Sequence, residues 1–316
     1  MEKILITGGT GFLGRELAVK LKKSYDVTIA GRNNTQNSFA QMTTGCPAIP
    51  LDVCSIESVK DAFNAVRPDY VIHAAATKFV DISEREPFEA VDVNVIGSEN
   101  VARVAIDKKC KAVIGISTDK AAPPISNTYA LTKSLMERMF AAVNSKSETR
   151  FTCVRFGNIA WSSGSVFPIW KKMAAMNKKI ETTGPHMRRY MISVSDAAEL
   201  VIRSLNNIER VKGAVLIQEM KALQMQEMLD LFAQQENVPW EKVAARPGER
   251  EDEYLLGEPE MRYSELLVLD NIRHYLFTPN KPAAQPVTEI LSTQNAPRFT
   301  TEELKAFLSL GEKLHA

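Results

Sequence analysis

The sequence lacks an excess of charge of either sign, because 39 lysine and arginine residues face 38 aspartate and glutamate residues, a formal net charge of +1. Nucleic acids and anionic membranes select concentrated basic surfaces, so neither is an expected partner. The sequence also lacks an apolar run near the roughly 20 residues that span a bilayer. It has no charged leader followed by a cleavable apolar segment. We therefore expect a cytoplasmic protein.

Cysteine is scarce, and the four residues Cys46, Cys54, Cys110 and Cys153 show no Cys-x-x-Cys or Cys/His spacing. A zinc site or a disulfide framework would require such spacing, so we expect no metal and four reduced thiols acting as small hydrophobic side chains. With 316 residues and 45% hydrophobic content, the chain can form one large α/β domain, with or without a smaller lobe.

Short apolar runs alternate with amphipathic segments in the first half of the chain. Strands are predicted at residues 3–7, 26–30, 48–52, 70–75, 112–117 and 151–156. Helices are predicted at residues 14–23, 55–66 and 87–108, and Ser55 is a suitable N-cap for the second of them. Repeated βαβ units of this kind predict an α/β fold with a Rossmann-type, doubly wound parallel sheet.

A glycine-rich segment, "ITGGTGFLGREL", joins the first predicted strand to the first helix. It places Gly8, Gly9, Gly11 and Gly14 where the chain must turn tightly and let a pyrophosphate approach the backbone. The N–H groups at the start of the helix would then bind that anion. The position of the motif favours a dinucleotide site over an ordinary tight turn.

The end of the second strand indicates which dinucleotide binds. NAD sites usually carry an acidic residue there for the ribose 2′-hydroxyl. This chain reads "TIAGRNN", with Arg32 and no carboxylate. Because a guanidinium suits a 2′-phosphate, we favour NADP over NAD. A solvated Arg32 beside an ordinary ribose is the alternative.

The regular alternation of predicted strands and helices ends after Phe156, where "GNIAWSSGSVFP" resembles a loop. Residues 1–160 are therefore predicted to form the NADP-binding Rossmann domain, to which later segments near 190–205 return. Residues 161–316 are expected to form mainly a smaller, substrate-binding lobe and a C-terminal extension.

Tyr129 and Lys133 form a Tyr-x-x-x-Lys pair whose side chains lie on one face of a helix. A lysine cation near a phenol favours the phenolate and lowers the pKa of the tyrosine. Such a tyrosine can take a proton from a substrate hydroxyl while the carbon gives a hydride to nicotinamide. An ordinary surface pair on a helix is the alternative.

Several motifs together resemble the extended short-chain dehydrogenase/reductase superfamily: "TGGTGFLG", "HAAA" at residues 73–76, "STDK" and Tyr129-x-x-x-Lys133. Within it, the chain is similar to the inverting UDP-N-acetylglucosamine 4,6-dehydratases of the polysaccharide-biosynthesis group. The stretches that carry this closer resemblance are "AATKFVDISEREP", "STDKAAPP", "VRFGNIAWSSGSVFP", "HMRRYMISVSDA" and "RPGERED".

The resemblance implies a lyase that oxidises C4 of a UDP-sugar, removes the C5 proton, expels the C6 hydroxyl as water and returns the hydride to C6. By analogy, Tyr129 acts in the redox step, Lys120 takes the C5 proton and Asp119 protonates the departing hydroxyl. Thr118 or Ser117 would hydrogen-bond the C4 oxygen. Lys120 must be neutral to act, and we expect a low-polarity pocket and the charge of Lys133 to favour that state.

The resemblance also implies ligand contacts. The expected cofactor-binding residues are Gly8, Gly11, Phe12, Leu13, Gly14, Arg32, Asp52, Val53, Ala74, Ala75, Ala76, Tyr129 and Lys133. The expected substrate-binding residues are Lys78, Asn158, Arg189, Arg246 and Glu249. A homo-oligomer is expected by analogy alone.

The chain departs from the family pattern in two places. It has one extra residue between Lys120 and Tyr129, and it has Asp252 and Glu253 where a His-Glu pair is more usual. These departures bear on the exact sugar and on the stereochemistry at C5. The nearest alternative is a nucleotide-sugar 4-epimerase or 4-reductase of the same superfamily, which shares the fold, the cofactor and the Tyr129/Lys133 pair. Simple C4 redox chemistry has no use for Asp119 and Lys120. A non-catalytic NADP-binding sensor is a second alternative, although a sensor has no need for Tyr129 and Lys133.

Overall fold

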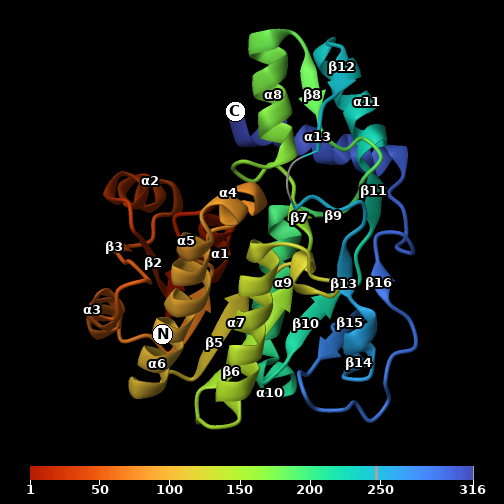
Figure 1. Cartoon of the computed structure of the whole chain (residues 1–316). Coiled ribbons are helices and arrows are strands. Elements are labelled where there is room, and N and C mark those ends of the chain that lie inside the picture. The colour runs from red at the N-terminus through yellow and green to blue at the C-terminus, as the bar shows by residue number, and fades with distance from the viewer. Residues whose placement is uncertain (246–247, 316) are drawn as a thin grey trace.

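The structure, a computed structural model, describes residues 1–245 and 248–315. Its centre is a nine-stranded sheet in the order β14-β15-β10-β6-β5-β4-β1-β2-β3 (Figure 1). The strands are β1 (Lys3–Thr7), β2 (Asp26–Gly31), β3 (Ala48–Pro50), β4 (Tyr70–His73), β5 (Ala112–Ile116), β6 (Arg150–Arg155), β10 (Val215–Gln218), β14 (Ser264–Leu269) and β15 (Ile272–Phe277). The first six strands are parallel and follow the 3-2-1-4-5-6 order of a Rossmann sheet, so the predicted fold class is confirmed.

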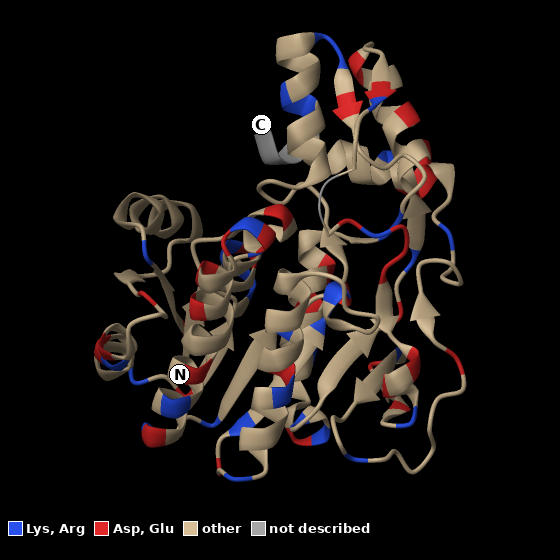
Figure 2. Ribbon diagram, viewed as in Figure 1, with Lys and Arg blue, Asp and Glu red and all other residues tan. Residues whose placement is uncertain are grey.

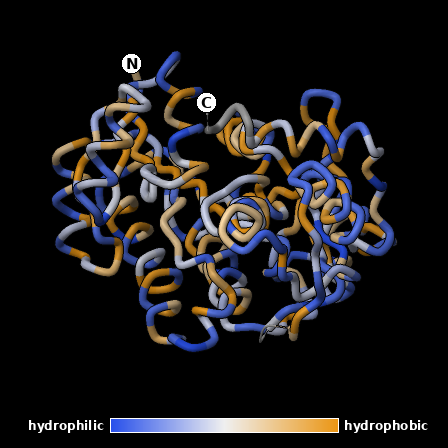
Figure 3. The backbone as a smooth tube through the Cα atoms, turned by 90° about the horizontal axis from the view of Figure 1, so that it is seen from above, coloured by the Kyte–Doolittle hydropathy of each residue, from blue (hydrophilic) through white to orange (hydrophobic). Residues whose placement is uncertain are grey.

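Helices cover both faces of the sheet (Figure 1). One layer holds α3 (Ile56–Val66), α6 (Gly97–Asp107) and α7 (Thr128–Asn144), and the other holds α1 (Phe12–Leu21) and α9 (Val194–Asn206). The remaining helices of the first half are α2 (Asn34–Thr44), α4 (Val80–Arg85), α5 (Pro87–Val91) and a π-helical turn, η1 (Asp92–Ile96). Figure 3 shows hydrophobic and hydrophilic stretches alternating along the helices, as expected where one side packs on a sheet.

Most of the predicted elements are present, with local differences. Ser55 caps α3, because its hydroxyl accepts a hydrogen bond from the Ser58 N–H. The helix predicted over residues 87–108 is interrupted by η1. β4 ends at His73, earlier than predicted, because its neighbour β1 ends at Thr7 and residues 74–77 leave the sheet.

The hairpin of β14 and β15, which extends the large sheet, was not predicted. Its turn is formed by Asp270 and Asn271, both with positive φ (51° and 62°). This backbone conformation suits a two-residue hairpin turn, and aspartate and asparagine tolerate it. The "DN" dipeptide between two apolar runs was therefore the available signal.

A second hydrophobic core lies outside the sheet, in the small lobe at the top of Figure 1. It is surrounded by α8 (Val166–Asn177), α11 (Met225–Glu236), α13 (Thr301–His315), β8 (Ile180–Thr182) and β12 (Trp240–Lys242). Its centre is aromatic: the rings of Phe167 and Phe232 stack at 6.4 Å, and Trp161 lies 5.2 Å from Phe167.

The remaining elements are short. They are η2 (Asp119–Ala121), β7 (Asn158–Ile159), β9 (Arg188–Ile192), α10 (Ile208–Val211), β11 (Ala222–Gln224), β13 (Tyr254–Leu256), α12 (Glu258–Met261) and β16 (Leu291–Ser292). Segments after residue 160 contribute α9, β10, β14 and β15 to the large sheet as well as forming the small lobe.

Charges of both signs are spread over both lobes, in keeping with the balanced composition (Figure 2). None of the helices in residues 1–245 and 248–315 is long and apolar enough to cross a membrane. The four cysteines are free thiols; three are buried and Cys54 is half-buried.

A buried ion network ties the sheet to the segments around it. Arg155, at the end of β6, is fully buried and donates hydrogen bonds to the carboxylates of Glu137 on α7 and Glu260 on α12. It also donates to the backbone oxygen of Leu255 in β13, at 2.8 Å. One guanidinium therefore joins β6 and α7 to the β13–α12 segment, 100 residues further along the chain.

Replacing Arg155 should be strongly destabilising, because two buried carboxylates would lose their cation. We expect Arg155→Met to lower the free energy of unfolding by about 3–5 kcal/mol, measured by urea denaturation. Arg150→Met, on the same strand but with an exposed ion pair to Glu209, should cost less than about 1 kcal/mol. Equal effects of the two substitutions would contradict this account of the network.

Candidate active site

A large cavity of about 1160 Å³ lies at the carboxyl ends of β1, β2, β4 and β5. In an open parallel sheet this edge is where ligands bind. The structure brings to it nearly all of the predicted cofactor and catalytic residues. They are Gly8, Gly11, Phe12, Leu13, Gly14, Arg32, Asp52, Val53, Ala74, Ala75, Ala76, Thr118, Lys120, Tyr129 and Lys133.

The glycine segment forms one wall of this cavity. Gly8 has a φ of +66°, and a Cβ there would lie 2.6 Å from the backbone nitrogen of Ala75. A Cβ on Gly14 would lie 2.5 Å from the Cα of Gly9. These close approaches require glycine. The cradle and the adjacent N-terminus of α1 fit a dinucleotide pyrophosphate.

Arg32 and Asp52 follow strands β2 and β3, and both line the large cavity there. Arg32 is exposed and forms no hydrogen bond or ion pair with any residue that the structure describes. The Asp52 carboxylate accepts a hydrogen bond from the Cys54 N–H at 3.0 Å and so shapes the turn after β3. The free guanidinium is therefore available to an anion, whereas Asp52 has a structural bond.

Tyr129 and Lys133 lie on α7 and are both buried. Burial raises the pKa of Tyr129 to about 12, and the cation that opposes this rise is Lys120. Burial lowers the pKa of Lys133 to about 8, and the Lys133 amine contacts the sulfur of Met136 at 3.4 Å. The expected lowering of the pKa of Tyr129 by Lys133 is therefore not found: burial raises this pKa, and the opposing cation is Lys120.

Lys120 lies in the short helix η2, beside two buried carboxylates. Its amine is 3.0 Å from Asp119 Oδ1 and 3.4 Å from Glu253 Oε1. Burial disfavours the ammonium, but the two carboxylates outweigh it, so the pKa of Lys120 lies above its usual value. The expectation of a neutral Lys120 is thus wrong for the free protein.

Asp119 is fully buried and lies behind Lys120; it does not line either of the two cavities at the site. Its Oδ1 accepts hydrogen bonds from Thr118 Oγ1 and Lys120 Nζ, and its Oδ2 has no hydrogen-bond partner in the described structure. The Ser117 hydroxyl donates to Glu137, which leaves Thr118 as the hydroxyl next to Tyr129.

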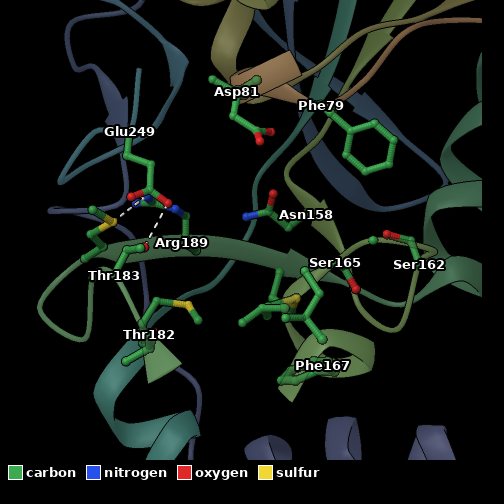
Figure 4. A pocket seen from close by; sticks show the side chains of 18 of the residues that line it. Phe79, Asp81, Asn158, Ser162, Ser165, Phe167, Thr182, Thr183, Arg189 and Glu249 are labelled. Atoms are coloured by element: carbon green, nitrogen blue, oxygen red, sulfur yellow. Dashed lines mark hydrogen bonds between the residues drawn. The ribbon is translucent and has the colours of Figure 1, made fainter. Parts of the chain in front are cut away.

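A second, smaller cavity of about 310 Å³ adjoins the first and reaches into the small lobe (Figure 4). Lys78, Lys120 and Asn158 line both cavities, so the two are continuous at these side chains. Arg189 and Glu249 line the smaller cavity. The predicted Arg246 lies outside the described residues.

Two of the predicted substrate residues are held by the protein itself. Arg189 donates hydrogen bonds to the backbone oxygens of Arg188, Arg250 and Glu251, and thus anchors the 250–251 segment. Glu249 accepts a hydrogen bond from the Thr183 hydroxyl at 2.9 Å, as Figure 4 shows. Both residues line the smaller cavity, but the Arg189 guanidinium also stabilises the backbone of residues 250–251.

Sequence reasoning missed Glu253, which is only 2% exposed and contacts Lys120 directly. The sequence "REDE", at residues 250–253, differs from the family pattern, but this difference indicated no role for Glu253. Its neighbour Asp252 forms a bidentate ion pair with Arg188 and is structural. Within the described residues, no three His, Cys, Asp or Glu side chains form a group able to hold a metal ion.

His73, in the "HAAA" motif, connects β4 to its neighbours. Its ring nitrogens lie 2.8 Å from Thr7 Oγ1 and 2.9 Å from Ser98 Oγ. Burial and the charge of Lys133 lower the pKa of His73 to about 3. The imidazole is therefore neutral at ordinary pH and holds together the floor of the large cavity.

This burial predicts a pH dependence of stability. Between pH 6.5 and about 3 the unfolded chain binds a proton at His73 that the folded chain refuses. The free energy of unfolding should therefore fall with falling pH in this window, by about 1.4 kcal/mol per pH unit from this residue. Urea denaturation at a series of pH values should show that the free energy of unfolding changes less steeply with pH in His73→Asn than in the wild type. His186 is exposed, and His186→Asn should keep the wild-type pH dependence.

The fold and the site together define a member of the extended short-chain dehydrogenase/reductase superfamily. A family model described as "Polysaccharide biosynthesis protein" matches residues 4–269, so the chain belongs to this family. Two curated relatives cover most of it. UDP-glucose 4-epimerase of Rickettsia bellii is 31% identical over 96% of this chain and 94% of its own length. An uncharacterized membrane protein of Methanocaldococcus jannaschii, MJ1061, is 32% identical over 82% of this chain and 81% of its own length.

Solved structures give the same classification. Pen from Bacillus thuringiensis superposes with a TM-score of 0.88 at 28% identity, covering 99% of this chain and 98% of its own. UDP-glucose 4-epimerase of Thermus thermophilus, in complex with NAD, has a TM-score of 0.67 at 19% identity, covering 79% and 88%, and shows the shared fold. The chain is thus an enzyme of the group that modifies nucleotide sugars.

Proposed function

We propose that the protein is an NADP-dependent 4,6-dehydratase acting on UDP-N-acetylglucosamine or a close relative. The observation that carries this proposal is the second proton-transfer pair. Lys120 lines the same cavity as Tyr129 and is paired with the buried Asp119. An enzyme that only oxidises and reduces C4 needs Tyr129 but has no step for this pair.

The residues can be assigned to successive steps. Tyr129 takes the proton of the C4 hydroxyl, and Thr118 hydrogen-bonds the C4 oxygen. Held in the larger cavity by the glycine segment between Gly8 and Gly14, NADP would supply the hydride acceptor for C4 and the hydride donor for C6. Lys120 removes the C5 proton, which the C4 ketone has made acidic. Asp119 supplies the proton with which the C6 hydroxyl leaves as water, by way of the Thr118 hydroxyl, which lies 2.8 Å from Asp119 Oδ1 and lines the cavity. Asn158, Lys78, Arg189 and Glu249 bind the UDP-sugar.

The contact of Lys120 with Asp119 explains how a charged lysine can become a base. Transfer of one proton from the Lys120 ammonium to Asp119, across 3.0 Å, breaks an N–H bond and forms an O–H bond. It creates a neutral amine and a carboxylic acid together, the two forms that the elimination requires. The C5 proton then restores the ammonium, and Asp119 becomes a carboxylate again as its proton passes through the Thr118 hydroxyl to the departing hydroxyl.

NADP is proposed over NAD because Arg32 is unpaired among the described residues and lies at the far end of the cavity. We expect Arg32→Ala to weaken NADP binding at least about tenfold and to leave NAD binding nearly unchanged, because only NADP carries the 2′-phosphate. Isothermal titration calorimetry of both cofactors measures this, with Arg103→Ala as a control on an exposed helix face. Equal loss for both cofactors would contradict the assignment.

A 4-epimerase is the second candidate, because the Rickettsia relative carries that name and covers nearly the whole chain. The two reactions differ at C5. Incubation with UDP-N-acetylglucosamine in deuterated water should give loss of one water and deuterium at C5, measured by mass spectrometry and NMR. Interconversion at C4 without deuterium uptake would replace the proposal with epimerisation.

Lys120→Ala should separate the two half-reactions. It should abolish deuterium uptake at C5 and water loss, yet still form bound NADPH, detected by its absorbance, because Tyr129 is intact. Tyr129→Phe is the matched comparison and should lose both signals. Normal dehydration by Lys120→Ala would remove Lys120 from the mechanism.

A further inference from the structure

Glu253 is the one buried carboxylate at the site, other than Asp119, that contacts the amine of Lys120 within the described residues. It lines the smaller cavity at the point where Lys120 and Asn158 also line it. The Lys120 amine therefore has three oxygen neighbours: Asp119 Oδ1 at 3.0 Å, and Asn158 Oδ1 and Glu253 Oε1, both at 3.4 Å. Three acceptors match the three N–H bonds of an ammonium.

The backbone of Glu253 is firmly held. Its N–H donates to Thr293 Oγ1 at 3.0 Å, and its carbonyl accepts from the Thr293 N–H at 2.9 Å. Two residues further on, the carbonyl of Leu255 accepts from Arg155. The strand β13 that follows packs beside η2, which carries Lys120. The carboxylate is thus attached to a rigid part of the scaffold.

The two carboxylates around Lys120 differ in their surroundings. Glu253 faces two guanidinium groups, Arg189 at 4.0 Å and Arg250 at 3.8 Å, in addition to Lys120. Asp119 has Lys120 as its ion-pair partner and accepts from the Thr118 hydroxyl. Glu253 thus has three cationic neighbours, whereas Asp119 has one. The Lys120 amine also lies nearer to Asp119 Oδ1 than to Glu253 Oε1, so we assign the proton transfer to Asp119 and a holding role to Glu253.

We propose that Glu253 is a positioning residue for the base: its fixed carboxylate and the Asn158 amide hold the two remaining N–H bonds of the Lys120 amine and so fix its place during the elimination. This rests on the proposed function, in which Lys120 removes the C5 proton. Without the carboxylate the long lysine side chain would be free to turn away from C5. Misplacement of a reacting group by about 1 Å can lower a rate on the order of 100-fold.

The proposal is tested with Glu253→Gln, Glu253→Asp and the control Glu251→Gln, a carboxylate two residues away that is largely exposed. We expect both Glu253 variants to lower kcat for deuterium uptake at C5 by about 10- to 100-fold. KM and the formation of bound NADPH should stay near wild type, because Tyr129 carries the C4 step. Glu251→Gln should resemble the wild type in kcat for C5 deuterium uptake, in KM and in the formation of bound NADPH.

The pH profile separates positioning from general damage. Lys120 is faced by Asp119, Glu253, Arg189 and Tyr129, and Arg250 lies behind Glu253. In the proposed mechanism Lys120 starts as the ammonium, so loss of its proton to solvent ends activity at high pH. Removing the Glu253 charge lowers the pKa of Lys120, so the alkaline limb of kcat should move to lower pH in Glu253→Gln. Glu253→Asp keeps the charge and should keep that limb near the wild-type position while still losing rate.

Each outcome decides the question. Two outcomes would overturn the role of Glu253 and leave the dehydratase assignment standing. One is a wild-type kcat for C5 deuterium uptake with an unshifted pH profile in Glu253→Gln. The other is an equal loss of C4 oxidation and C5 exchange in both Glu253 variants. Absence of C5 deuterium in the wild type would overturn the dehydratase assignment itself, and this role with it. A slower C5 exchange with the shifted limb supports the proposal.

Discussion

The buried guanidinium of Arg155 is the contact on which the site depends. Through Glu137 it fixes α7, the helix that presents Tyr129 and Lys133 on the same face, and through Leu255 and Glu260 it fixes the segment that follows Glu253. The residues of the redox step and the carboxylate beside Lys120 are thus attached to one cation at the end of β6. A buried ion network is costly to assemble, but it places parts of the chain that no local structure could align.

The two cavities meet at Lys120, and this meeting determines what chemistry is available. The larger cavity has the features of a dinucleotide site, and the smaller one extends into the lobe that Trp161, Phe167 and Phe232 hold together. In the proposed reaction, a sugar that spans the junction would have its C4 side near Tyr129 and its C5 side near Lys120. At this junction burial raises the pKa of Tyr129 and lowers that of Lys133, while the neighbouring carboxylates hold the pKa of Lys120 above its usual value.

The sequence predicted what depends on neighbours along the chain. The glycine segment, the six-strand parallel sheet, and the adjacency of Asp119 and Lys120 were all legible in this way. It did not predict effects that depend on the tertiary structure. The pKa of Tyr129 rises because the phenol is buried, Arg189 is engaged by backbone oxygens of a later segment, and Glu253 reaches Lys120 only when β13 packs beside η2. The Asp270-Asn271 turn was legible and was overlooked.

The indole N–H of Trp161 donates to the carbonyl of Phe307 in α13, a hydrogen bond between residues 146 positions apart. Trp161 begins the loop whose Ser163 carbonyl holds Lys78 and whose Ser162 and Ser165 line the smaller cavity. During synthesis on the ribosome, the Rossmann sheet can therefore begin to form well before this loop has its final anchor. A nascent chain would acquire its dinucleotide cradle early and its sugar-facing surface late, which orders the maturation of the enzyme in time.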